Sequence, residues 1–359
     1  MLNSLWKNDS TLMVGIDIGS HAIKAVLLNK NHVGYIVEAV AIESIPTGLI
    51  VNREIQDIGV VGQLIAKIRK KLIPSIQYAA SAVSGQNVIT KNIYMDADLN
   101  EQELANQIEV EAQSIIPYPL DEVSIDFEPL DINPVNPYKI NVLLSAARTE
   151  SIEARVAAIK LGGFKTRVVD IESYAISRAH NLVLAQLPDV QLEQLIATID
   201  IGATMMLFSV YEADQHIYSR DHLFGGEQYT QNVMSYYDMS FEEAELAKLS
   251  NNISPHYTTD ILRPFQKILV QKIRHAIQLF LTSSGKSQID HLVISGGSAL
   301  IDNLVTILIQ ELGINTIIAE PFKGMVISDR INKKELIQLS PRFMVATGLA
   351  LRSFVPWHI

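Results

Sequence analysis

An approximate internal repeat constrains the fold of this 359-residue chain more than any other feature. Residues 15–24 read GIDIGSHAIK, and residues 198–207 read TIDIGATMML. A repeat of this kind indicates two related structural units. In each copy an apolar strand turns through a glycine into a second strand, and a third strand follows. The predicted second and third strands are 23–29 and 35–44 in the first copy, and 206–211 and 215–223 in the second.

The composition is that of a compact globular chain, and it excludes several functional classes. Apolar residues make up 48% and charged residues 19% of the chain, and its length allows two large lobes. The absence of cysteine excludes disulfides, thiolate metal sites and cysteine nucleophiles. A net charge of −10 disfavours binding to nucleic acid, because a phosphate-binding surface needs clustered lysine and arginine.

The sequence also predicts a cytoplasmic protein that does not itself enter a membrane. The most apolar stretch, 304–318, is interrupted by polar residues and a glycine. It therefore falls short of the roughly 18 apolar residues that a spanning helix needs. Residues 1–10 carry one lysine and no apolar segment, so no secretory signal is expected.

Helical signals follow the strands in both halves. Apolar residues recur at helical spacing over 55–72. A capping-box pattern at 240–243 introduces a short helix over 244–249. Longer helices are predicted over 260–284 and 299–312.

The segment 84–163 has no counterpart in the second copy. Its predicted strands are 87–94, 123–129 and 139–147, and its predicted helices are 101–116 and 149–161. We interpret it as an inserted α/β subdomain. The predicted organisation is lobe one over 1–195, with a first phosphate hairpin at 12–30 and the insert at 84–163, and lobe two over 196–359.

The first copy of the repeat carries residue types that suit a phosphate site. Gly19 allows a ligand to approach the backbone, and Ser20 adds a hydroxyl donor to the N–H groups of the turn. Lys24 returns a positive charge from the next strand. Taken alone, this turn is more often an ordinary hairpin.

The second copy favours the phosphate interpretation. Its candidate phosphate-contacting residues are Asp200, Gly202, Ala203 and Thr204. Two facing hairpins would clamp a triphosphate between the lobes. Asp17 and Asp200 would then flank a Mg²⁺ ion, largely through water, because this ion keeps most of its waters and is typically held by one or two carboxylates plus phosphates.

A third element lies late in the chain, where an apolar strand at 291–295 is followed by Gly296, Gly297 and Ser298. The backbone of such a loop can approach a flat ligand closely. A glycine pair is common at strand-to-helix turns, so by itself it is weak evidence for a ligand-binding loop. What favours this interpretation is the position of the loop after the two hairpins.

The chain carries two Asp-Ile-Gly hairpins and then a late Ser-Gly-Gly-Ser loop. With this ordered set of motifs it resembles the superfamily of actin, Hsp70 and sugar kinases over nearly its whole length. The insert is similar to that of FtsA and of the PilM family, which belongs to the inner-membrane platform of type IV pilus assembly. The resemblance implies an α/β, actin-like two-lobed fold with duplicated ribonuclease-H-like domains and an FtsA-type inserted subdomain in lobe one. The segments that resemble the PilM family are GIDIGS at 15–20, LFGGE at 223–227, RPF at 263–265, residues 276–280 before the serines 283 and 284, and TGLALRSF at 347–354.

The resemblance also implies further nucleotide contacts. Glu245 and Lys248 would contact ribose and adenine, although an exposed ion pair explains the same spacing. Gly225 and Gly226 would close the cleft wall nearby. Glu172 would position the water that attacks the terminal phosphate, although a carboxylate at a helix N-terminus is an equally good interpretation.

Two departures from the superfamily pattern bear on catalysis. His21 and Ala22 replace small hydroxyl residues in the first loop, and Met205 and Met206 remove a hydroxyl from the second. Fewer phosphate donors are therefore expected. If the chain hydrolyses ATP, turnover should be slow.

The function implied by the resemblance is a cytoplasmic ATP-binding scaffold of type IV pilus assembly. Its implied partner is the N-terminal cytoplasmic tail of PilN, which would dock as an extended peptide between the insert and the rest of lobe one. Other pilus platform proteins and a second copy of the chain are further implied partners. Attachment to the inner face of the cytoplasmic membrane would be indirect.

Two other functions share the fold. An FtsA-like division filament normally needs a C-terminal membrane anchor, and residues 352–359 are too short and too poor in basic residues for one. A sugar or acetate kinase would need a catalytic aspartate in a polar substrate pocket, and the sequence offers no compelling candidate.

Overall fold

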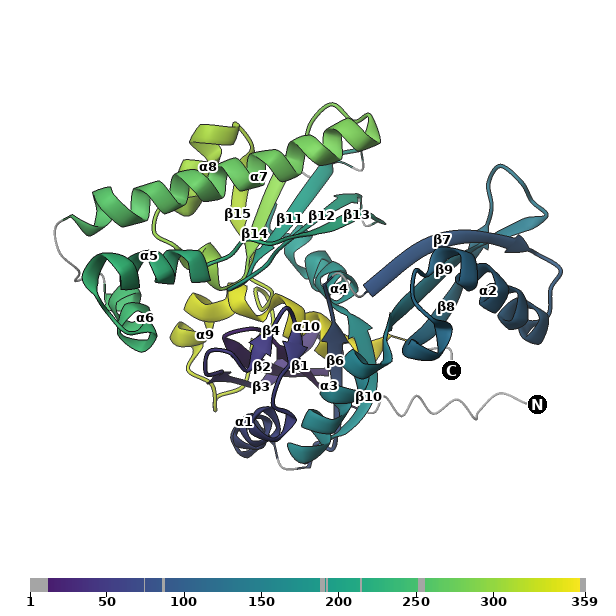
Figure 1. The fold of residues 1–359 in the computed structure, drawn as a ribbon, viewed down its shortest axis with the longest axis horizontal. Coiled ribbons are helices and arrows are strands. Elements are labelled where there is room, and N and C mark those ends of the chain that lie inside the picture. Colours follow the sequence, from purple (N-terminus) through teal and green to yellow (C-terminus); the bar gives the residue numbers. More distant parts are fainter. Residues whose placement is uncertain are drawn as a thin grey trace.

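The computed structural model describes residues 12–73, 75–85, 88–187, 191, 193–213, 215–250 and 256–355. Two lobes, each built on a large sheet, lie against one another, and a smaller sheet protrudes to one side (Figure 1). The expectations for residues 1–10, for residue 87 and for the end of the tail at 356–359 concern residues outside this described part.

The two large sheets share one topology. Their strand orders are β10-β6-β1-β2-β3-β16 and β13-β12-β11-β14-β15. In each sheet the first strand of the repeat pairs antiparallel with the second strand and parallel with a later one. This equivalence confirms the predicted actin-like fold with duplicated ribonuclease-H-like units. The strands of the first sheet are β1 (Met13–Ile18), β2 (Ala22–Lys30), β3 (Tyr35–Ser44), β6 (Tyr78–Val83), β10 (Lys165–Ile171) and β16 (Val326–Ile327). Those of the second are β11 (Leu195–Ile201), β12 (Met206–Glu212), β13 (Gln215–His222), β14 (His291–Ser295) and β15 (Asn315–Ile318).

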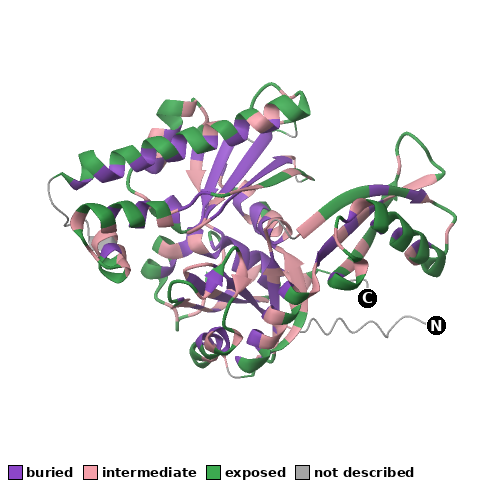
Figure 2. Ribbon diagram, viewed as in Figure 1, coloured by how far each residue is buried: buried purple, intermediate pink, exposed green. Residues whose placement is uncertain are grey.

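Helices cover these sheets, and their apolar residues point inward as the periodicity predicts. Figure 2 shows buried residues along the strands and exposed residues on the outer face of α7. The helices around the first sheet are α1 (Ile58–Lys71), α3 (Thr149–Leu161), α4 (Glu172–Leu184), α9 (Lys333–Leu339) and α10 (Met344–Ala350). Those of the second lobe are α5 (Glu227–Tyr237), α6 (Phe241–Ser250), α7 (Arg263–Ser284) and α8 (Leu304–Leu312).

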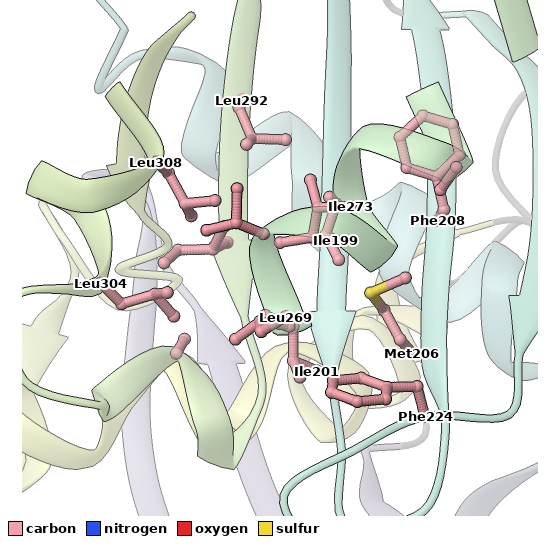
Figure 3. Close-up of a cluster of buried hydrophobic side chains, with 14 of the residues drawn as sticks. Ile199, Ile201, Met206, Phe208, Phe224, Leu269, Ile273, Leu292, Leu304 and Leu308 are labelled. Atoms are coloured by element: carbon pink, nitrogen blue, oxygen red, sulfur yellow. The ribbon is translucent and has the colours of Figure 1, made fainter. Parts of the chain in front are cut away.

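The core of the second lobe is a layer of apolar side chains between its sheet and two helices (Figure 3). Ile199 and Phe208 come from the central strands, whereas Ile273 comes from α7 and Leu308 from α8. All four side chains are fully buried. This layer fixes the two strands that carry the second hairpin of the repeat.

The predicted helix over 299–312 is interrupted. The chain forms a short 3₁₀ turn, η3 (Gly297–Leu300), before α8 begins at Leu304. Asn303 adopts a left-handed conformation with φ of 57°, which a continuous helix does not contain. The late loop is therefore a separate turn at the end of β14.

The protruding unit is a three-stranded sheet, β7-β9-β8, covered on one face by α2 (Glu101–Ile115). Asn100 and Glu103 form a capping box at the start of α2. Ile93 and Leu144 pack against Ile108 of this helix in a separate small core. The three strands are β7 (Val88–Asp96), β8 (Val123–Ile132) and β9 (Lys139–Arg148).

Helix α3, which the sequence suggested as part of the insert, packs with lobe one instead. Its Ala158 and Ile159 belong to the core beneath the first sheet. A Cβ built at Gly62 of α1 would lie 2.6 Å from Leu161 Cβ, so the two helices touch closely. The part that protrudes is thus the β7–β9 segment, shorter than the expected 84–163.

The end of the chain also returns to lobe one, although 196–359 was expected to form lobe two. Strand β16 pairs with β3, and α10 packs against β1, β2 and α4. Every residue of α10 is buried. An apolar helix of this kind must be covered by other elements on two sides. One side of α10 is covered by the face of the first sheet that lies opposite α1.

A core shared by both lobes surrounds α4, and it contains a buried histidine. His180 stacks on Tyr211 of β12 with ring centroids 3.8 Å apart, and its Nδ1 lies 2.8 Å from Thr198 Oγ1. Burial, with a smaller contribution from His216, lowers the pKa of His180 to about 3. The imidazole is therefore neutral at pH 7.

We expect acid to destabilise the fold through His180. Its folded pKa of about 3 lies below the ordinary 6.5, so its contribution is complete above pH 6.5 and is lost as the pH falls towards 3. Between pH 7 and pH 5 the loss should be about 2 kcal/mol. Urea unfolding of the wild type and His180→Phe at both pH values measures it, because other titrating groups cancel in the difference. An equal pH dependence in both proteins would contradict the assignment.

Candidate functional site

The two hairpins of the repeat face one another across the boundary between the lobes. The Ser20 hydroxyl of the first lies 2.9 Å from the Thr204 hydroxyl of the second. The turns are closed in the same way: the Gly19 N–H donates to the Ala22 carbonyl at 3.1 Å, and the Gly202 N–H donates to the Met205 carbonyl at 2.9 Å. The structure thus brings together the loops that the sequence predicted as a clamp.

Each hairpin places its aspartate near the end of a central strand, because β1 and β11 are equivalent strands. Asp17 lies opposite Lys24 in the strand pair, and the lysine Nζ contacts its Oδ2 at 2.7 Å. Asp200 accepts a hydrogen bond of 2.7 Å from the Ser295 hydroxyl of β14. Lys24 is thus already paired with the first carboxylate.

Negative charge is concentrated between the hairpins. Burial, together with the charges of Glu172 and Asp17, raises the pKa of Asp200 to about 6, although the Ser295 hydroxyl and Lys24 act against the shift. Asp221 of β13 has a pKa of about 6 for similar reasons, burial first and Glu172 second. A cation bound here would relieve this repulsion. Within the described part of the chain no group of three or more possible metal-ligating side chains occurs.

Gly225 and Gly226 support the second hairpin. The Gly226 N–H donates to the Gly202 carbonyl at 3.0 Å, and the N–H of Glu227 donates to the Ala203 carbonyl at 2.8 Å. A Cβ at Gly225 would lie only 2.3 Å from that Ala203 oxygen. These glycines are required by close backbone packing, and they set the start of α5 against the hairpin.

The late loop at residues 296–298 packs against the second hairpin. Gly296 has a φ of 86°, and a Cβ there would lie 2.4 Å from the Ile201 carbonyl. The Ser298 hydroxyl donates to the Gly202 carbonyl at 3.4 Å. A Cβ at Gly297, in contrast, would meet nothing within 4 Å, and this residue is exposed.

Glu245 and Lys248 form an ion pair on α6, and both contact Thr230 of α5. Neither side chain is fully exposed. The pair lies near the first hairpin, because the charges of both residues act on His21, whose pKa burial lowers. His21 also approaches Glu227 at 3.5 Å and the Phe241 ring at 5.1 Å between centroids.

Glu172 is the first residue of α4, and its side chain is buried. Its carboxylate pairs with Arg53, with Nη1 to Oε2 at 3.3 Å and Nη2 to Oε1 at 3.4 Å. Glu172 thus lies at the N-terminus of α4, where a carboxylate is favoured by the helix dipole, and its charge acts on Asp200 of the second hairpin.

Arg53 is the residue that the sequence analysis missed. It lies in a tight turn between two short strands, β4 (Ile50–Val51) and β5 (Glu54–Ile55). Asn52 and Arg53 both have positive φ, of 51° and 69°. The preference of asparagine for this conformation was the one local signal for the turn.

Taken together, the residues fit a nucleoside triphosphate with a divalent cation. The two hairpins offer hydroxyls and backbone groups, Asp17 and Asp200 offer carboxylates, and the late loop leaves the backbone of Gly297 exposed. In the described part of the chain, no helix has the length and apolar character to cross a membrane.

Comparison with known proteins identifies a family and a shared fold. The family described as type IV pilus assembly protein PilM matches residues 15–354. Among solved structures, the chain is similar to the PilM-PilN type IV pilus biogenesis complex, with 23% identity and a TM-score of 0.81 over 96% of this chain and 99% of that one. It is also similar to the ethanolamine utilization protein EutJ from Carboxydothermus hydrogenoformans, with 16% identity and a TM-score of 0.56 over 94% and 89%. At these identities the two structures show a shared fold.

Proposed function

We propose, from the premise that this chain belongs to the family of type IV pilus assembly protein PilM, that it is an ATP-binding scaffold and that its partner is the N-terminal tail of PilN. The nucleotide lies with Mg²⁺ between the two hairpins. The protein lies at the inner face of the cytoplasmic membrane, held there through this partner. Self-association and contacts with other pilus platform proteins belong to the same proposal.

The contact between the Ser20 and Thr204 hydroxyls carries the nucleotide part of the proposal. It joins hairpins 184 residues apart in the chain, each with a strand-end aspartate and a glycine turn. Mg²⁺ shared by two carboxylates and the phosphates would join the lobes more firmly than this single contact. Nucleotide occupancy would thus set the relative position of the lobes, and any hydrolysis would serve to reset it.

The docking part rests on the open face of the protruding sheet. Helix α2 covers one face, where Ile93 and Val142 are buried. Asn92 and Leu143 pair across β7 and β9 and project from the other face, since side chains alternate along a strand. Leu143 is half-buried. An extended peptide on this face would find both apolar and polar contacts.

This open face is turned towards lobe one. Thr90 of β7 hydrogen-bonds to Tyr174 of α4, and the charge of Glu128 of β8 acts on both Tyr174 and Arg178 of that helix. The space between the sheet and α4 is thus bordered by two elements with different roles. A peptide there would contact the insert and the helix that begins with Glu172 at the nucleotide site, which would couple docking to the cleft.

We expect a synthetic peptide of the PilN tail to raise the melting temperature of the protein. A ligand at 100 times its dissociation constant adds about 2.7 kcal/mol to the stability of the folded state. Leu143→Arg and Asn92→Arg should abolish the shift, because each puts a bulky cation on the open face. Thermal melts with and without the peptide measure it.

Val110→Arg is the matched control for this experiment. Val110 is a 66% exposed apolar residue on α2, in the same protruding unit but on its helical side. This variant should keep the full shift. Equal shifts in Leu143→Arg and Val110→Arg, or no shift in the wild type, would rule out docking on the open face.

A further inference from the structure

Arg53 is held near the two hairpins by an unusual backbone turn. Both central residues of the β4–β5 hairpin have positive φ, a conformation that costs about 1 kcal/mol or more for an ordinary side chain such as arginine. A hydrogen bond stabilises this turn, since Arg155 Nη2 donates to the Arg53 carbonyl at 2.6 Å. The chain thus maintains a strained turn that directs this guanidinium inward, where its side chain is 12% exposed.

The guanidinium lies among carboxylates from both lobes. Burial works against its charged form, but the charges of Glu172, Asp221, Asp17 and Asp200, in that order, raise the pKa of Arg53 above its ordinary value. Two of these groups belong to the first lobe and two to the second. The charge of Arg53 is therefore stabilised by the two hairpin carboxylates, Asp17 and Asp200, and by the carboxylates of Glu172 and Asp221.

The pairing of Arg53 is incomplete. Its two terminal nitrogens contact Glu172, but its Nε–H is buried and has no hydrogen-bond partner in the part of the chain that the structure describes. An unpaired buried donor costs roughly 1–3 kcal/mol. Among the cations near the hairpins, Lys24 is already paired with Asp17. Each terminal nitrogen of Arg53 also carries a second N–H, so the guanidinium has donor capacity left for an anion.

We propose that Arg53 is the residue that recognises the terminal phosphate of a bound nucleoside triphosphate. The guanidinium fork matches phosphate geometry, and each such contact is a charge-assisted hydrogen bond. Binding of the phosphate would complete the donor set of Arg53 and draw it partly from Glu172, which would release that carboxylate towards a water beside the phosphate. A nucleoside diphosphate lacks this third phosphate. Arg53 therefore distinguishes ATP from ADP, an inference that rests on the proposed nucleotide function.

The test is calorimetric titration of the full chain with ATP and with ADP, each with Mg²⁺. In Arg53→Met and Arg53→Lys we expect about a 10-fold loss of affinity for ATP, with ADP affinity changed by less than about 2-fold. The double variant Arg53→Met/Glu172→Gln removes the buried carboxylate that the single variant leaves unpaired. It should show the same loss of ATP preference even if Arg53→Met folds poorly.

Arg178→Lys is the matched control. Arg178 is a partly buried arginine paired with Asp170, and the charges that act on it come from Asp170, Arg352 and Glu128, none of which lies at the hairpins. This variant should keep the wild-type ratio of ATP to ADP affinity. An equal loss for both nucleotides in the Arg53 variants, or no loss for either, would overturn the assignment. A wild type that binds neither nucleotide would overturn the proposed function itself.

Discussion

Removal of both hairpin carboxylates, in Asp17→Ala/Asp200→Ala, should weaken Mg²⁺–ATP binding by at least about 100-fold, or roughly 2.7 kcal/mol. Each single variant should lose about 10-fold, because Mg²⁺ held between two carboxylates and the phosphates loses one of its few protein partners. Calorimetric titration measures this. Undiminished affinity in the variants would exclude the clamp.

Removal of the metal gives the second half of this experiment. With EDTA present, the wild type should bind ATP as weakly as the double variant or more weakly, because the carboxylates of Asp17 and Asp200 then face the phosphates without a cation. Asp96→Ala is the matched control. Asp96 pairs with Lys139 at 2.7 Å in the protruding sheet, the same distance as Asp17 to Lys24. Its loss should leave ATP binding unchanged.

Replacement of Gly348 by alanine should destabilise the protein by about 3 kcal/mol or more. Gly348 lies in α10, and a Cβ there would sit 1.7 Å from the Ala175 carbonyl of α4. That atom belongs to a backbone, so no side-chain rotation relieves the clash. The two helices would have to separate, which would open the core that the lobes share. Urea unfolding measures the change.

Gly59→Ala provides the comparison for Gly348→Ala. Gly59 also lies in a helix, α1, but a Cβ there would meet only the tip of the Asp57 side chain, at 3.2 Å. Alanine should be neutral there or stabilise the helix by up to about 1 kcal/mol, since it lowers the conformational entropy of the unfolded chain. Similar losses in both variants would show that close packing of α10 on α4 does not limit stability.

These two experiments concern two regions of the fold that α4 connects. The hairpins meet at the cleft, while α4 and α10 lie in the core between the sheets. Helix α4 begins at Glu172 in the cleft and carries Tyr174 next to the protruding sheet. Helix α4 therefore connects the proposed nucleotide site with the proposed docking face.

Much of the fold could be predicted from local sequence. The repeated Asp-Ile-Gly segments predicted two sheets of one topology, because the same strand-turn-strand pattern folds in the same way twice. Ser240 and Glu243 form the predicted capping box, since a cap depends only on residues three apart. The apolar spacing over 55–72 produced α1, with Asp57 as its N-cap.

Part of the candidate site could also be proposed from local sequence. Asp17 and Asp200 could be chosen as candidates because each is the second-last residue of a repeat strand, and the equivalence of the two strands gives them corresponding positions in the two sheets. Arg53 could not be found. Its partner Glu172 is 119 residues away, and the turn that carries Arg53 has no glycine to mark it. Likewise, nothing local indicated that the Met13 N–H bonds to Ser353, 340 residues along the chain.

The sequence by itself therefore determined the duplicated strands, the glycine turns and the helix caps, because these depend on neighbouring residues and on hydrophobic periodicity. Only the tertiary structure decided that α3 and α10 belong to lobe one, since two apolar faces must find each other among several possible partners. It also decided the charge state of the cleft. The pKa of Asp200 depends on burial and on carboxylates from distant segments, and an electrostatic interaction acts through the distance in space between charges, whatever their separation along the chain.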